Sequence, residues 1–160
     1  MMNIEEQIGT LLASQGLTLA TAESCTGGLV AHRITNVSGS SAYYLGGFVT
    51  YANEAKEEWL GVQHETLLAH GAVSEETARE MAQGARQRTG ADVGIAVTGI
   101  AGPTGGTPDK PVGLVYIALS AKDVQHCRRY IWKGNRLFNK EKSAEAALQL
   151  ILAHLQERRG

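Results

Sequence analysis

The chain contains few cysteines, and this scarcity excludes two kinds of architecture. Cys25 and Cys127 are the two cysteines among its 160 residues. That number is too small for a disulfide framework or a four-cysteine zinc site. No cluster of histidine and acidic residues has the spacing of a metal site either. We therefore expect a protein that works with its own side chains, without metal or cofactor.

Charge of one sign and long apolar runs are also lacking. The net charge is −1 at pH 7, so nothing marks a surface for nucleic acid or an anionic membrane. No apolar run approaches the roughly 20 residues that span a bilayer. The acidic start, Met1–Glu6, has no signal-peptide pattern. We therefore expect a cytoplasmic protein with neither nucleic acid nor membrane as a partner.

The chain does have an ordered alternation of helical and strand patterns. Helices are predicted over 3–15, 25–36, 54–60, 64–69, 74–88 and 142–156, and strands over 17–22, 43–51, 92–98, 112–120 and 124–132. The strand at 92–98 is apolar nearly throughout, which is typical of a central strand covered on both faces. This order predicts a single domain over residues 1–160, an α/β fold built as a three-layer α/β/α sandwich with a mixed sheet of about five strands.

The stretch Ala22–Gly28 joins a predicted strand to a predicted helix. The first N–H groups of such a helix lack internal partners and can hold an anion or an oxyanion. The Ser24 hydroxyl in this turn is therefore a candidate nucleophile, and Gly27 and Gly28 would let a ligand approach closely. Ser24 or Thr26 could instead simply cap the helix. Cys25 is a rival nucleophile, although a buried and inert thiol is the commoner state.

A second stretch, 46–56, ends the next predicted strand, and Gly46 and Gly47 in it mark a bulge or a close approach. Ligands bind beyond the carboxyl ends of strands in open α/β sheets. Lys56 could serve as the base for a serine if burial keeps its amine neutral, and Tyr51 could orient the proton. A solvated lysine and a core tyrosine are the alternative interpretation. A histidine base in a Ser-His-Asp arrangement also stays open.

A third stretch, 98–106, ends a strand with a glycine-rich loop. Its spacing fits neither a Walker A loop nor a dinucleotide-binding fingerprint. Its backbone N–H groups could still surround a phosphate, or the loop could be a mobile surface segment. Because all three stretches end strands, we expect them to converge on one site.

Several motifs in this order resemble the CinA C-terminal domain family. They are Ala22-Glu23-Ser24-Cys25-Thr26-Gly27-Gly28, the run 47–56, Leu60-Gly61-Val62, His70-Gly71-Ala72-Val73-Ser74, the run 97–106 and Lys110-Pro111-Val112-Gly113. The resemblance covers residues 4 to 155, nearly the whole chain. It implies a stand-alone member of the family and a three-layer α/β/α fold, as the pattern itself predicts.

The resemblance also implies a nicotinamide-nucleotide amidase, which hydrolyses nicotinamide mononucleotide to nicotinate mononucleotide and ammonia in the recycling of pyridine nucleotides. It implies metal-free catalysis with Ser24 as the nucleophile that forms an acyl-enzyme, Lys56 as the base and Tyr51 assisting. Thr98 and Arg136 match positions that the family places at the active site. We assign the substrate contacts to Thr26, Gly27, Gly28, Gly46, Gly47, Thr98, Gly99, Ile100, Ala101, Gly102, Gly105 and Arg136.

The sequence departs from the family pattern after the last strand. Relatives commonly carry an aspartate and an arginine where this chain has Asn135 and Lys140. Lysine does not replace arginine at a forked contact, so the departure keeps an alternative open: a catalytically weak or inactive nucleotide-binding module with a regulatory role. The sequence leaves the oligomeric state open as well, a homodimer included.

Overall fold

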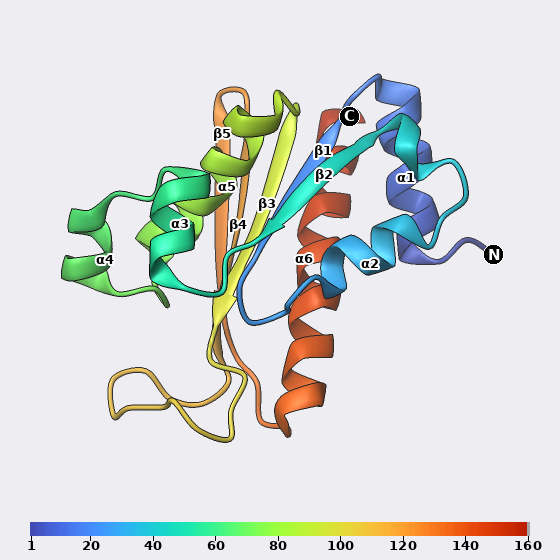
Figure 1. Ribbon diagram of the computed structural model, residues 1–160. Coiled ribbons are helices and arrows are strands. Elements are labelled where there is room, and N and C mark those ends of the chain that lie inside the picture. Colours follow the sequence, from blue (N-terminus) through green and yellow to red (C-terminus); the bar gives the residue numbers. More distant parts are fainter. Residues whose placement is uncertain (160) are drawn as a thin grey trace.

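The structure is a computed structural model that describes residues 1–159. It consists of one five-stranded sheet between two layers of helices (Figure 1). The helices are α1 (Ile4–Gln15), α2 (Leu29–Thr35), α3 (Asn53–Leu60), α4 (His64–His70), α5 (Glu75–Thr89) and α6 (Arg136–Arg159), and a short 3-10 helix covers Ser40–Ala42. The strands are β1 (Leu19–Glu23), β2 (Tyr44–Val49), β3 (Val93–Gly99), β4 (Leu114–Ala121) and β5 (Val124–Ile131). The predicted three-layer fold with a mixed sheet is confirmed.

The order of strands in the sheet brings three strand ends together. The order is β2-β1-β3-β4-β5. Strands β2, β1 and β3 run parallel to one another, β4 runs antiparallel to β3, and β5 runs antiparallel to β4. Glu23 at the end of β1 pairs with Val49 of β2 and with Val97 of β3. The segments that follow these three strands therefore leave the sheet at the same edge. The strand β3 lies in the middle of the sheet and is buried from Val93 to Thr98, so its predicted central position is confirmed.

The two faces of the sheet carry side chains of different size. One face packs large side chains, among them Leu19, Ile95 and Ile117, against α1, α2 and α6. On the opposite face, alanine side chains of the strands, among them Ala20, Ala96 and Ala118, pack against α3 and α5. Figure 1 shows these helices on that side of the sheet. Small side chains let α5 lie close to the strands. Gly94 is placed under it, where a Cβ would collide with the Ala82 carbonyl oxygen.

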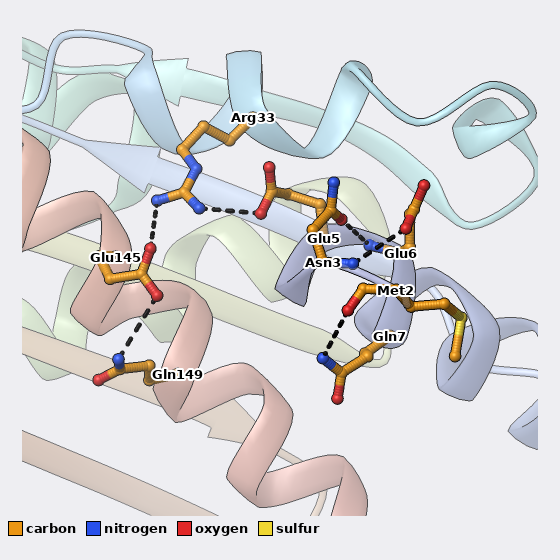
Figure 2. Close-up of polar contacts among 8 residues, drawn as sticks. All are labelled: Met2, Asn3, Glu5, Glu6, Gln7, Arg33, Glu145 and Gln149. Carbon is orange, nitrogen blue, oxygen red and sulfur yellow. Dashed lines mark hydrogen bonds and ion pairs between the residues drawn. The ribbon is translucent and has the colours of Figure 1, made fainter.

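A two-armed ion pair joins the three helices of the first face. The guanidinium of Arg33 on α2 donates 2.8 Å hydrogen bonds to Glu5 on α1 and to Glu145 on α6, as Figure 2 shows. Figure 2 also shows the capping box of α1, in which Asn3 and Glu6 each accept from the other's backbone N–H. The planar guanidinium can reach two carboxylates at once, so this contact fixes the relative position of three elements.

Two helices begin elsewhere than predicted. Helix α2 begins at Leu29 rather than at residue 25, because Gly27 and Gly28 have φ angles of 61° and 106° and cannot belong to a right-handed helix. Helix α6 begins six residues before the predicted residue 142, where Asn135 accepts a 2.9 Å hydrogen bond from the Phe138 N–H. Its first turns carry no apolar period, so periodicity missed them.

The segment around Tyr51 also differs from the prediction. Strand β2 ends at Val49, so Tyr51 lies outside it. The next helix, α3, begins at Asn53, and its capping position falls to Ala52, which makes no side-chain cap. No helix among residues 1–159 is long and apolar enough to cross a lipid bilayer.

Candidate active site

The turn that carries Ser24 is held by the residue before it. The Glu23 side chain is 1% exposed, and its carboxylate accepts hydrogen bonds from the Thr26 hydroxyl at 2.6 Å and from the N–H groups of Gly28, Val30 and Ala31 at 3.2, 2.9 and 3.0 Å. These donors include the orphan N–H groups at the start of α2, where a negative charge is favourable. Glu23, rather than Ser24 or Thr26, therefore caps this helix.

Ser24 lies directly beside a buried amine. Its N–H donates to the Val97 carbonyl at 2.9 Å, which fixes the turn against β3. The Lys56 Nζ lies 3.1 Å from the Ser24 Oγ and donates to the Thr50 carbonyl at 2.7 Å. Lys56 reaches this place from α3, which follows β2. Two strands that end at one edge of the sheet thus bring together residues 32 positions apart in the sequence.

The environment of Lys56 disfavours its charged form. The side chain is 1% exposed, and no carboxylate in the described part of the chain lies within ion-pair distance of it. Burial therefore lowers the pKa of the Lys56 amine. A lowered pKa increases the fraction of the amine that is neutral and able to accept a proton. The solvated lysine considered from the sequence is excluded by this burial.

Cys25 has the opposite character. Its side chain is 6% exposed, and burial raises the pKa of its thiol to about 12. The nucleophilic form of cysteine is the thiolate. Cys25 is therefore an inert thiol at neutral pH, which leaves Ser24 as the nucleophile candidate of this turn.

A cavity of about 270 Å³ opens over Ser24 and Lys56. Its walls come from the turn after β1, the start of α3, the connection before α5 and the segment after β3. The lining residues are Ser24, Cys25, Tyr51, Asn53, Lys56, Ala72, Val73, Thr98, Gly99, Ile100, Ala101, Thr104 and Gly105. The three stretches singled out in the sequence therefore do meet at one place.

Two of the predicted residues, Arg136 and Thr98, donate hydrogen bonds that hold the walls of this cavity in place. The guanidinium of Arg136 donates to the Gly102 carbonyl at 2.8 Å and to the Tyr51 hydroxyl at 3.0 Å. The Thr98 hydroxyl donates to the Ala72 carbonyl at 2.8 Å. Arg136 thus joins the glycine-rich segment to Tyr51, and Thr98 holds the connection before α5. Arg136 and Gly102 do not themselves line the cavity.

Sequence reasoning missed a buried residue that supports the same wall. Asn139 on α6 is 1% exposed, and its amide donates to the carbonyls of Ala101 and Gly134 at 3.0 Å each. Its side-chain oxygen also accepts from the Gly134 N–H at 3.0 Å. A lone asparagine in a polar stretch gives no periodic signal, so only the placement of α6 reveals it.

Thr26, Gly27 and Gly28 lie on the other side of the turn. They line a neighbouring cavity of about 400 Å³ together with His32 and Lys140. Their groups are partly engaged, because the Gly27 N–H donates to the Ser24 carbonyl and the Gly28 N–H to Glu23. The N–H groups from Thr26 to Gly28 are the expected place for an oxyanion, and the bonds made by Gly27 and Gly28 do not fit that expectation.

Gly46 and Gly47 lie in β2 and line neither cavity. Gly47 is packed against Thr21 and Tyr44 with no room for a side chain, and the pairing of β1 with β2 skips Leu45. The predicted bulge and close approach are thus confirmed, and they serve strand pairing. Among residues 1–159, no three His, Cys, Asp or Glu side chains are grouped so that they could hold a metal ion.

The fold has solved counterparts. The competence/damage inducible protein CihA from Agrobacterium tumefaciens superposes with a TM-score of 0.92 at 43% sequence identity, over 98% of this chain and 97% of that one. The competence damage-inducible protein A (ComA) from Klebsiella pneumoniae gives a TM-score of 0.92 at 36% identity, over 96% of this chain and 95% of that one.

The sequence has relatives under the same family name. CinA-like proteins of Chloroherpeton thalassium and Chlorobium chlorochromatii are 60% and 52% identical over 94% and 98% of this chain. The chain spans only 37% and 38% of the length of those two relatives. The model of the CinA C-terminal domain matches residues 1–155. With the shared fold, this match shows that the chain belongs to the CinA C-terminal domain family.

Proposed function

We propose that the chain is an amidase that hydrolyses the carboxamide of nicotinamide mononucleotide to nicotinate mononucleotide and ammonia. The observation that carries this proposal is the contact between Ser24 and Lys56, in which a buried amine lies 3.1 Å from a hydroxyl at the floor of a cavity. An unpaired, desolvated lysine next to a serine is the arrangement needed to activate a hydroxyl for covalent catalysis. The amide substrate comes from the family resemblance.

In the acylation step, the Ser24 Oγ attacks the carboxamide carbon while its proton passes to the neutral Lys56 amine. The hydrogen bond from Lys56 to the Thr50 carbonyl holds the amine in place during this transfer. The tetrahedral intermediate then breaks its C–N bond, and the Lys56 ammonium gives its proton to the departing nitrogen, which leaves as ammonia. The product of this step is an ester between Ser24 and the pyridine carbonyl.

The deacylation step repeats the same proton transfers with water. A water molecule attacks the ester carbon and loses a proton to Lys56. The intermediate then breaks its bond to the Ser24 Oγ, which takes that proton back, and the carboxylic acid product is released and ionises. Both intermediates carry an oxyanion. We assign its stabilisation to the N–H group of Cys25, a residue that lines the same cavity and whose N–H has no acceptor in another of the described residues.

We assign the phosphate of the substrate to the glycine-rich segment Gly99–Gly106. Backbone N–H groups of such a segment can turn toward an anion, and the guanidinium of Arg136 lies against it through the Gly102 carbonyl. Binding of this remote dianion would hold the carboxamide against Ser24 and raise turnover as well as affinity. The departure at residue 135 does not disturb this region, because Asn135 caps α6 as an aspartate would.

The direct test is incubation of the protein with nicotinamide mononucleotide and measurement of ammonia and nicotinate mononucleotide. We expect both products in equal amounts from the native chain, none from Ser24→Ala and a substantial rate from Cys25→Ala. Binding of the nucleotide without release of ammonia would contradict the amidase. It would favour the regulatory nucleotide-binding module, which the lysine at position 140 keeps as the second candidate.

A further inference from the structure

The cavity contains one polar side chain on a regular helix that the reaction above does not use. Asn53 lines the cavity with Ser24 and Lys56. It is the first residue of α3, and it makes no capping bond, since Ala52 holds the capping position without one. No hydrogen bond joins the Asn53 side chain to another side chain or backbone group within residues 1–159. Its amide is thus free to bind a ligand.

The other polar side chains of the cavity already have partners. Lys56 contacts the Ser24 hydroxyl and the Thr50 carbonyl, the Thr98 hydroxyl donates to Ala72, and the Tyr51 hydroxyl accepts from Arg136. Thr104 also lines the cavity, but it lies in the irregular connection between β3 and β4. Asn53 therefore combines a free polar group with a fixed backbone.

The position of Asn53 relative to Lys56 sets what it can reach. Residues three apart lie on the same face of a helix, one turn from each other. Lys56 extends from this face to the Ser24 Oγ, 3.1 Å away. Asn53 lies one turn earlier on that face and lines the same cavity, in which a group attacked by Ser24 must lie. The carbonyl oxygen of Asn53 can accept an N–H there, and its NH₂ group can donate.

We propose that Asn53 is a specificity-determining residue that binds the carboxamide of the substrate and holds the amide plane against Ser24. This inference rests on the proposed amidase function. A primary carboxamide offers N–H donors and a carbonyl acceptor, which an asparagine side chain can match.

Asn53 is uncharged, and this affects the protonation of Lys56. An aspartate at this position would also accept an N–H, but its negative charge would favour the protonated form of Lys56. A larger fraction of the amine that must accept the Ser24 proton would then be charged. Asparagine supplies the hydrogen-bonding groups and leaves the pKa of Lys56 low.

Binding to a chain that cannot turn over separates this inference from the proposed function. In the Ser24→Ala background, calorimetry should show that nicotinamide mononucleotide binds. Adding Asn53→Leu should weaken that binding about five- to tenfold, the loss expected for one or two hydrogen bonds. The matched control is Glu58→Leu, which changes an exposed position of the same helix outside the cavity and should leave the affinity within twofold.

A pH profile supplies a readout that a merely structural role would not change. In the chain with Ser24 intact, Asn53→Asp should move the rise of kcat to higher pH, whereas Asn53→Leu should leave its position unchanged and mainly raise KM. Unaltered affinity in Asn53→Leu, or an unshifted profile in Asn53→Asp, overturns the role of Asn53. If the native chain releases no ammonia from the nucleotide, the proposed function itself fails, and this inference fails with it.

Discussion

Replacing Glu23 by glutamine should destabilise the protein, although nothing in the sequence alone marks this residue as important for stability. The Glu23 carboxylate accepts four hydrogen bonds, three on Oε1 and one, from the Ala31 N–H, on Oε2. Glutamine keeps one oxygen for the first three donors but presents an NH₂ group to the Ala31 N–H. One bond to a charged acceptor is lost, at a cost of about 1.5–3 kcal/mol. The three that remain lose their charged acceptor.

We therefore expect Glu23→Gln to lower the free energy of unfolding by about 2–3 kcal/mol. That loss corresponds to a fall in Tm of about 4–12 °C for a chain of this length. Urea denaturation followed by circular dichroism measures the change. Glu58→Gln is the matched control, because it alters an exposed glutamate on α3 and should change stability by less than about 0.5 kcal/mol. A Glu23→Gln midpoint equal to that of Glu58→Gln would refute the capping role of Glu23.

Five further predictions concern the chemistry. Lys56→Arg should reduce kcat about 10²–10⁴-fold, since a guanidinium does not give up its proton. In the native chain kcat should rise with pH as Lys56 loses its proton, at a pH below the usual lysine pKa. Cys25, with a pKa of about 12, should resist iodoacetamide at pH 8 in the folded state, and rapid labelling would contradict its burial. Exhaustive chelation should leave the rate unchanged, whereas loss of activity and rescue by one divalent ion would overturn the metal-free mechanism. Nicotinamide riboside should have a kcat/KM about ten- to a hundredfold lower than that of the mononucleotide. Arg136→Ala should reduce this difference in kcat/KM. Equal kcat/KM for the two substrates in the native chain would exclude phosphate recognition.

The sequence predicted the fold well because its strands differ strongly in character. The apolar run 92–98 became the central strand β3, and the more polar run 124–132 became the edge strand β5. Helix boundaries were predicted less well. The start of α6 depends on the cap at Asn135, and the start of α2 depends on two glycines with positive φ. Neither leaves a periodic apolar pattern.

The contact between Ser24 and Lys56 was anticipated from the sequence, whereas the residues that support this contact were not. Ser24 and Lys56 follow strands that end at one edge of the sheet, so motif position was sufficient to bring them together. Glu23 and Asn139 act through bonds to backbone groups of distant or irregular segments. Such bonds depend on how the chain folds back on itself, which no local pattern encodes. Gly47 was assigned to the substrate, but its lack of a side chain serves the packing of β1 against β2.

The covalent intermediate on Ser24 provides the most direct measurement of the central claim. The native chain would be mixed with nicotinamide mononucleotide, quenched in acid within one turnover and digested, and its peptides would be examined by mass spectrometry. We predict the nucleotide acyl group as an ester on Ser24, absent from Ser24→Ala and present in Cys25→Ala. Release of ammonia with the acyl group on Cys25, or undiminished release by Ser24→Ala, would contradict the account.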